Sequence, residues 1–172
     1  MGYYFQQSKP NYMSTKEELF VKMALLSWKA TQKSVNKNLE LLSEEELNTP
    51  ILPGKNTPAW IIGHLAAVND NMATLLELGP KLKPEYEKAL IHPDGSVKPP
   101  STSEMIKYWH DSNAYVNEKM EALTGADWFG KHTAVSAEDF AKEPHRNKLN
   151  VLISRTNHLS HHLGQLVLVA KK

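Results

Sequence analysis

The chain of 172 residues contains no cysteine. This absence excludes disulfides, thiolate-bound metals, iron–sulfur clusters and a cysteine nucleophile. Any metal must therefore be held by histidine, aspartate or glutamate, and any thiol chemistry must use a thiol that the substrate supplies. Because cysteine is absent, nothing calls for an oxidising compartment, and we expect a cytoplasmic location.

The chain also lacks a charge excess and a long apolar run. It has 20 basic and 19 acidic residues, which gives a formal net charge of +1. A near-neutral balance provides no electrostatic reason to expect nucleic acid or an anionic membrane as a partner. No apolar run approaches the roughly 20 residues that span a bilayer. We therefore expect a globular domain that acts on a small molecule.

Helical patterns account for most of what is present. Apolar spacing and capping residues predict four long helices and no strand, with the helices over residues 14–42, 57–78, 101–124 and 147–170. Long connections over 80–100 and 126–146 join the last three. The simplest architecture is an all-α four-helix bundle over residues 14–172, preceded by an extended arm over residues 1–13. Functional sites in such bundles are built from side chains on facing helices.

The first predicted helix has two apolar surfaces. Leu19, Met23, Leu26 and Leu41 recur near helical spacing, which indicates the face toward the bundle. Trp28 lies off that stripe, so part of the helix could face a second surface. Together with the aromatic residues of the arm, Trp28 favours a homodimer, although a monomer is also compatible with both features.

The last predicted helix contains three histidines within five residues. His158 and His162 are about 40° apart around the helix and one turn apart along it, whereas His161 points about 100° away from His162. An apolar stripe passes through Leu159 and Leu166, and His162 lies closer to its centre than His161 does. We interpret His158 and His162 as an inward-facing pair and His161 as a flanking residue.

A third inward-leaning histidine, His64, lies at the margin of the buried face of the second predicted helix. An unpaired buried polar group costs roughly 1–3 kcal/mol, so three imidazoles near apolar faces need a common explanation. A divalent ion bound by His64, His158 and His162 supplies it, with an open position typical of catalytic sites. Ordinary hydrogen bonds to neighbouring carbonyls remain an open alternative, because the spacing does not show that the two helices face each other.

Two amides are candidate catalytic residues that support the ligands or orient the substrate. Gln165 lies between His158 and His162 in angle, one turn on, and Asn71 lies two turns beyond His64.

Other aromatic and imidazole groups receive simpler interpretations. His161 is either a surface or dimer-facing residue or a base beside the site. Trp128 either anchors the core or covers the mouth of the site. The remaining histidines are expected to be solvated, in loops or on polar faces: His92, His110, His132 and His145.

Two stretches resemble the DinB/YfiT-like family. Residues 53–65 read PGKNTPAWIIGHL and residues 157–166 read NHLSHHLGQL, and the match in order and spacing extends over roughly residues 14–170. The resemblance implies a four-helix bundle, often a homodimer, with a metal held by one histidine of the second helix and an H-x-x-x-H pair of the last. These map onto His64, His158 and His162. Nickel or zinc is the ion we expect, with iron and manganese as alternatives.

The resemblance also implies a class of reaction. Relatives chiefly transfer a low-molecular-weight bacterial thiol onto an electrophile, or use such a thiol for isomerisation, and the metal binds and deprotonates the thiol. Our leading hypothesis is a metal-dependent thiol transferase. A hydrolase that uses metal-bound hydroxide is the second, weakened because no Asp or Glu stands beside the histidines. A non-enzymatic, stress-related metal-binding bundle is the third.

Overall fold

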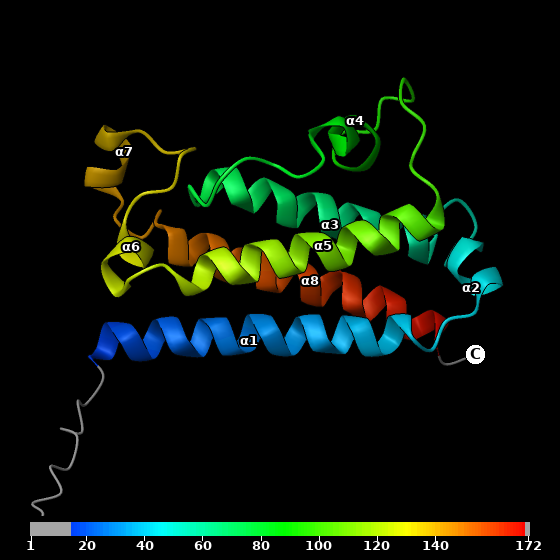
Figure 1. The fold of residues 1–172 in the computed structure, drawn as a ribbon, viewed down its shortest axis with the longest axis horizontal. Coiled ribbons are helices and arrows are strands. Elements are labelled where there is room, and N and C mark those ends of the chain that lie inside the picture. Colours follow the sequence, from blue (N-terminus) through cyan, green and yellow to red (C-terminus); the bar gives the residue numbers. More distant parts are fainter. Residues whose placement is uncertain (1–14, 171–172) are drawn as a thin grey trace, which may run out of the picture.

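The structure is a computed structural model that describes residues 15–170. Four long helices dominate it (Figure 1): α1 (Lys16–Leu39), α3 (Pro58–Leu75), α5 (Thr102–Glu121) and α8 (Lys148–Val169). No strand is present among the described residues. The predicted all-α four-helix bundle is therefore confirmed, whereas the predicted arm over residues 1–13 lies outside the described residues.

Short helices fill the connections between the long ones. They are α2 (Glu44–Asn48), the 3-10 helix η1 (Pro84–Tyr86), α4 (Glu87–Leu90), α6 (Gly125–Phe129) and α7 (Ala137–Lys142). Within residues 15–170, no helix has both the length and the apolar character needed to cross a membrane.

The long helices begin within one or two residues of the predicted positions. The side chains of Thr15, Thr57, Ser101 and Asn147 each accept a hydrogen bond from the backbone N–H three residues on. The end of α3 was predicted too late, at residue 78. Helix α3 stops at Leu75 because the backbone leaves the helical region at Glu77, whose φ is 59°.

The direction of the helices explains the long connection between α3 and α5. Figure 1 shows α1 and α8 running one way and α3 and α5 running the opposite way. Helix α3 packs mainly on α5, and α1 packs mainly on α8. Because α3 and α5 are parallel, the chain must return along the whole bundle between them, and η1 and α4 lie on this crossover. Helices α3 and α8 are antiparallel neighbours, and they carry the histidines.

Asp70 attaches the crossover to the bundle. This buried carboxylate accepts hydrogen bonds from the backbone N–H of Leu82 (2.7 Å) and Lys83 (2.9 Å). It also accepts one from the hydroxyl of Tyr108 on α5, at 2.7 Å. Helices α3 and α5 and the crossover therefore meet at one carboxylate, and the crossover that carries α4 is held against α3.

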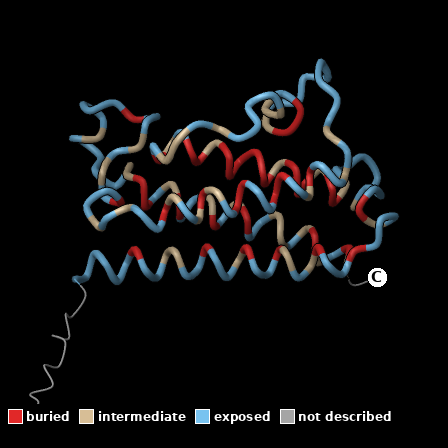
Figure 2. Tube along the Cα trace, viewed as in Figure 1, coloured by how far each residue is buried: buried red, intermediate tan, exposed pale blue. Residues whose placement is uncertain are grey.

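The predicted inward face of α1 is wrong. Met23 and Leu26 are 64% and 58% exposed, whereas Trp28 and Val35 are fully buried. Leu19 and Trp28 are nine residues apart, which places them about 180° apart around the helix. The bundle took the face of Trp28, and Figure 2 shows the buried positions of α1 along one side only.

Amide side chains explain why the face of Trp28 turns inward. Its Nε1 donates to Oδ1 of Asn117 on α5 at 2.9 Å, and Asn117 Nδ2 donates to Oε1 of Gln32 at 2.9 Å. Gln32 Nε2 in turn donates to Oδ1 of Asn113, which also accepts from Asn69 of α3 at 2.8 Å. Residues that look polar in the sequence thus pair with one another inside the bundle.

Candidate metal centre

The three predicted ligands converge at the interface of α3 and α8. His158 Nε2 lies 3.3 Å from Nε2 of His64 and 3.1 Å from Nε2 of His162. All three ring nitrogens lie within 4.8 Å of one another, and no other group of three His, Asp or Glu side chains in the described part of the chain does so. The two helices therefore face each other in the structure, which the sequence alone did not show.

Hydrogen bonds at the far side of two rings set their orientation. His64 Nδ1 lies 2.7 Å from the carbonyl oxygen of Leu90, the last residue of α4. His162 Nδ1 lies 2.7 Å from Oε1 of Gln165. Both partners are acceptors, so each Nδ1 donates its proton and each Nε2 presents a lone pair. Gln165 therefore fixes the orientation of the His162 ring.

These residues fit a divalent ion. If His64 and His162 both present lone pairs, His158 Nε2 can donate a proton to only one of them, and its own Nδ1 is buried without a hydrogen-bond partner. A cation bound by all three Nε2 lone pairs removes the conflict among these atoms, and the proton of His158 then lies on Nδ1. Tetrahedral bonds of about 2.0–2.1 Å place ligand nitrogens about 3.4 Å apart. The distances of 3.1 and 3.3 Å agree with that spacing.

Burial keeps the three imidazoles neutral. It is the main reason that the pKa of His64 and the pKa of His162 are lowered. Burial, with the nearby charges of His162, His64 and Arg155, lowers the pKa of His158 to about 4. Neutral imidazole is the form that binds a metal, so the site is ready to accept a cation at neutral pH without first losing protons.

The three histidines are partly exposed to solvent. All three are half-buried, and the half-buried Trp60 stacks on His64 with ring centroids 5.3 Å apart and planes 8° apart. His161 is exposed, and its ring lies edge-on to that of His162 at 5.2 Å. Trp60 therefore covers one face of the His64 ring.

The structure places some other predicted residues differently. No hydrogen bond joins the Asn71 side chain to the three histidines within residues 15–170, and Asn71 instead lines a small cavity with Asp70 and Lys81. For Trp128 the structure confirms the first of the two interpretations, because this residue is buried in the core.

The remaining histidines mostly follow the prediction. His92, His110 and His145 are exposed as expected. The prediction of a solvated side chain is wrong for His132. This residue is half-buried, and its Nδ1 accepts a hydrogen bond from the backbone N–H of Ala134 at 3.2 Å. The loop after α6 folds back over α3, which the sequence pattern of that loop did not show.

Sequence reasoning also missed three neighbours of the site. The Leu90 carbonyl is 26 residues from His64, so no local pattern connects them. Trp60 precedes His64 by one helical turn, a spacing that indicates contact. Arg155 precedes His162 by seven residues, which places it within about 20° on the same face of α8. The spacing therefore indicates that Arg155 lies on the side of α8 that carries His162.

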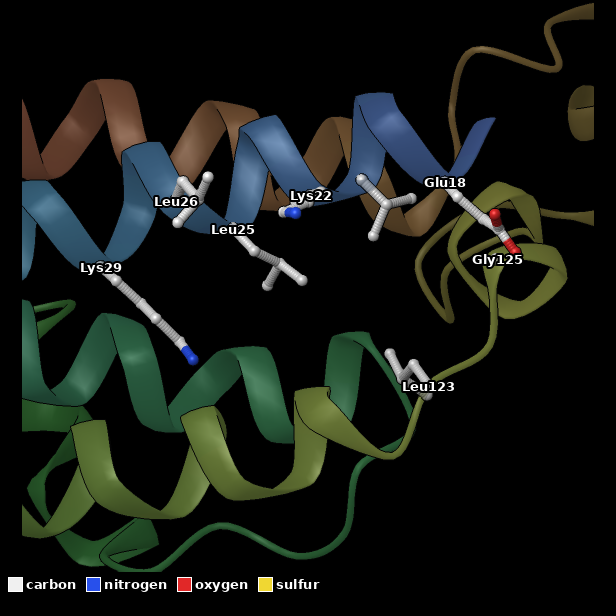
Figure 3. A pocket seen from close by; sticks show the side chains of 8 residues that line it. Glu18, Lys22, Leu25, Leu26, Lys29, Leu123 and Gly125 are labelled. Carbon is white, nitrogen blue, oxygen red and sulfur yellow. The ribbon is translucent and has the colours of Figure 1, made fainter. Parts of the chain in front are cut away.

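A second cavity lies away from the histidines (Figure 3). It has a volume of about 360 Å³ and is lined by leucines of α1 and by Leu123, with Glu18, Lys22 and Lys29 at its edge. Lys29 forms an ion pair with Glu121 at 2.8 Å. No histidine lines this cavity, so it contains no counterpart of the three-imidazole cluster.

Comparison with known proteins agrees with this architecture. A solved structure described as "YfiT from Bacillus subtilis is a probable metal-dependent hydrolase with an unusual four-helix bundle topology" is similar to the chain, with a TM-score of 0.59 and 18% identity over 95% of this chain and 92% of that one. At this identity the likeness shows the fold. No curated protein matches the chain. The family model of the DinB superfamily matches residues 27–166, and the chain therefore belongs to the DinB superfamily.

Proposed function

We propose that the chain binds one divalent ion through the Nε2 atoms of His64, His158 and His162 and uses it to act on a small molecule. The observation that carries this proposal is the convergence of the three Nε2 atoms at 3.1 and 3.3 Å, while Nδ1 of two of the rings is already hydrogen-bonded. Nickel or zinc is the ion that we expect, with iron or manganese as alternatives, since imidazole suits all of them.

The reaction that we propose is transfer of a low-molecular-weight thiol onto a small electrophile. When bound, the ion supplies Lewis acidity that lowers the pKa of a thiol or water in its open position. The chain contributes three neutral ligands, which leave the full charge of the ion to act on the incoming group. Gln165 and the Leu90 carbonyl hold two of the rings, and the chain has no cysteine of its own to compete. Such a thiol is kept reduced in the bacterial cytoplasm, which we propose as the location.

Metal-dependent hydrolysis is the second candidate. One observation favours it, namely that the similar structure from Bacillus subtilis is described as a probable metal-dependent hydrolase. Against it, the ligand cluster in the described part of the chain contains imidazoles only. Proton transfer from water would then fall to His161, which is exposed beside His162.

Elemental analysis of protein purified without a histidine tag or chelator tests the metal site. We expect about one ion per chain in the wild type, loss of the ion in His158→Ala, and retention in His161→Ala, whose ring lies outside the cluster. No bound ion, and none taken up on titration, would contradict the proposal.

Activity assays then separate the candidate reactions. The loaded protein is assayed for conjugation of bacterial thiols to model electrophiles and, separately, for cleavage of esters and amides. We expect metal-dependent conjugation that disappears in His158→Ala. Cleavage without conjugation would favour the hydrolase. Absence of both, with one ion bound, would indicate a structural metal in a non-enzymatic bundle.

We also propose that two copies pair through the outward face of α1. Leu19, Phe20, Met23 and Leu26 are 47–64% exposed on this face, and a helix face in contact with water is usually polar. Sedimentation of the wild type and of Met23→Glu tests this. A dimer that dissociates in the variant without loss of bound metal is expected, and a monomeric wild type would contradict it.

A further inference from the structure

Arg155 is a half-buried arginine without an anionic partner. Its Nε is buried and has no hydrogen-bond partner, and among residues 15–170 no carboxylate forms an ion pair with its guanidinium. The only other arginine in the sequence, Arg146, pairs with Glu143 at 3.2 Å. Burial lowers the pKa of Arg155, yet a guanidinium stays charged in proteins. A buried cation is normally paired, so Arg155 has an unfilled need for an anion.

The position of Arg155 connects it to the metal centre. It lies on α8 about 4.5 Å of helix rise before His158 and about 10.5 Å before His162, on the same side of the helix. Its positive charge is one of the causes that lower the pKa of His158 and the pKa of His64. Arg155, His158 and His162 therefore lie on one side of α8, within two helical turns of one another.

Arg155 also lines a cavity. The cavity has a volume of about 290 Å³ and lies between α8, the end of α3 at Leu75, and the loop that contains His132. Its lining includes Asn150 and Ser154 but no aspartate or glutamate. Among the described residues, the charge in this cavity is therefore positive, which favours an anionic occupant.

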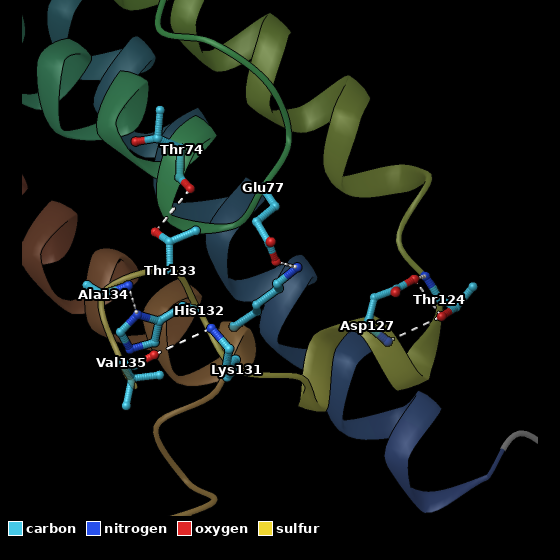
Figure 4. A network of polar contacts seen from close by, with 10 residues as sticks. Thr74, Glu77, Thr124, Asp127, Lys131, His132, Thr133, Ala134 and Val135 are labelled. Carbon is cyan, nitrogen blue, oxygen red and sulfur yellow. Dashed lines mark hydrogen bonds and ion pairs between the residues drawn. The ribbon is translucent and has the colours of Figure 1, made fainter. Parts of the chain in front are cut away.

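The loop that lines this cavity through His132 and Ala134 is held against the end of α3 (Figure 4). The backbone N–H of Thr133 donates to the Leu75 carbonyl at 3.1 Å, and its hydroxyl donates to the Thr74 carbonyl at 3.2 Å. His132 Nδ1 accepts from Ala134, so the neutral ring carries its proton on Nε2. Burial, Arg146 and Lys131 lower the pKa of His132, which keeps it neutral. The loop therefore contributes the Nε2–H of His132 as a hydrogen-bond donor and adds no negative charge to the cavity.

We propose that Arg155 binds the carboxylate of the substrate thiol, so that the protein selects an acidic thiol over a neutral one. This inference rests on the proposed function, because the sulfur must reach the three-histidine centre. The planar guanidinium suits a carboxylate, with which it can form two parallel hydrogen bonds. Arg155 acts as a binding residue for the substrate and does not take part in bond formation.

A pair of probe thiols tests the selection in the cobalt-loaded full-length protein. The sulfur-to-cobalt charge-transfer band is titrated with 3-mercaptopropionate and with 2-mercaptoethanol, which lacks the carboxylate. In Arg155→Met we expect the affinity for 3-mercaptopropionate to fall about 10- to 100-fold, as for loss of a charged hydrogen-bonded pair. The affinity for 2-mercaptoethanol should change less than about twofold.

Two variants control this comparison. Arg155→Lys keeps the charge without the planar fork and should retain part of the preference for 3-mercaptopropionate. Arg146→Met removes the other, ion-paired arginine and should leave both affinities unchanged. Equal effects of Arg155→Met on the two probes would overturn the inference while leaving the proposed function intact.

A second measurement needs neither a variant nor a metal. The Nε–H groups of Arg155 and Arg146 give separate signals in the NMR spectrum of the metal-free protein, which is titrated with propionate. Saturable movement of the Arg155 signal alone is expected, and no movement, or equal movement of both signals, would overturn the inference. If the protein binds no cobalt or neither thiol, the proposed function fails and this titration still decides the role of Arg155.

Discussion

At the scale of single residues, each imidazole of the centre must be neutral to donate a lone pair. His158 shows this most clearly, because burial and neighbouring charges lower its pKa to about 4, while an exposed imidazole has a pKa near 6.5. The same burial that keeps the His158 imidazole neutral makes the stability of the metal-free protein sensitive to acid. The unfolded chain binds a proton at His158 that the folded chain does not.

The metal-free protein should therefore lose stability as the pH falls from about 6.5 toward about 4. In this window the unfolded state binds more protons than the folded state, so the free energy of unfolding falls with pH. Urea unfolding at several pH values measures the effect. His158→Gln provides the control, since it removes the group and should unfold with a weaker dependence on pH than the wild type. Identical pH profiles would contradict the assignment.

Asp70 is a second residue whose hydrogen bonds predict the effect of a substitution on stability. It accepts three hydrogen bonds from Leu82, Lys83 and Tyr108, and burial and the Asp70 carboxylate raise the pKa of Tyr108. We expect Asp70→Asn to lower the free energy of unfolding by about 2–3 kcal/mol, because one donor then faces an amide N–H₂.

Asp111 is the matched control for this change. It forms an exposed i,i+4 ion pair with Lys107, so Asp111→Asn should cost only about 0.3–0.5 kcal/mol. Urea unfolding of both variants measures the difference. Equal losses would show that the crossover is not held by Asp70.

At the scale of the helices, the close packing of α3 on α5 depends on the glycine that precedes His64. A Cβ at Gly63 of α3 would lie 2.6 Å from Sδ and 2.8 Å from Cγ of the buried Met105 on α5. Gly164 of α8 is also within a helix, but a Cβ there would meet nothing within 4 Å. Alanine substitutions at these two glycines therefore distinguish the effect of side-chain packing from the effect of backbone entropy.

Alanine substitution at these two positions should have opposite effects. We expect Gly164→Ala to raise the free energy of unfolding by about 0.5–1 kcal/mol, since alanine favours the helix. We expect Gly63→Ala to lower it by about 1–3 kcal/mol, because Met105 must move in a packed core. Denaturant unfolding measures both changes. A stabilising Gly63→Ala would mean that α3 and α5 are not in close contact at this point.

At the scale of the whole molecule, the centre joins helices that are distant in the sequence. His64 and His158 are separated by 94 positions and meet only when α3 and α8 pack. An ion that binds the folded state alone must stabilise that packing.

The metal should therefore raise the melting temperature of the protein. At a concentration 100 times the dissociation constant the expected gain is about 2.7 kcal/mol. For a domain of this size the gain corresponds to a rise of roughly 5–11 °C. Thermal unfolding with and without the ion measures it, and His64→Ala should show little or no rise. A wild type that melts equally with ion and with chelator would contradict a site across α3 and α8.

The sequence by itself determined the elements and the ligand types. Thr57 with Pro58 and Asn147 define where α3 and α8 begin, because capping depends on residues within one turn. The absence of cysteine left imidazole and carboxylate as the available ligands, and the spacing of His158 and His162 placed both on one side of α8.

Tertiary structure alone decided which faces meet. Helix α1 offered two apolar stripes, and the bundle took the face of Trp28 because amides on α5 could pair with it. The Leu90 carbonyl reached His64 through a crossover whose path depends on the parallel directions of α3 and α5. Arg155 was recognised as a candidate binding residue only because three segments far apart in the sequence form a cavity around it. Local propensity acts over a few residues, whereas these contacts join segments far apart in the chain, so only the packed molecule could reveal them.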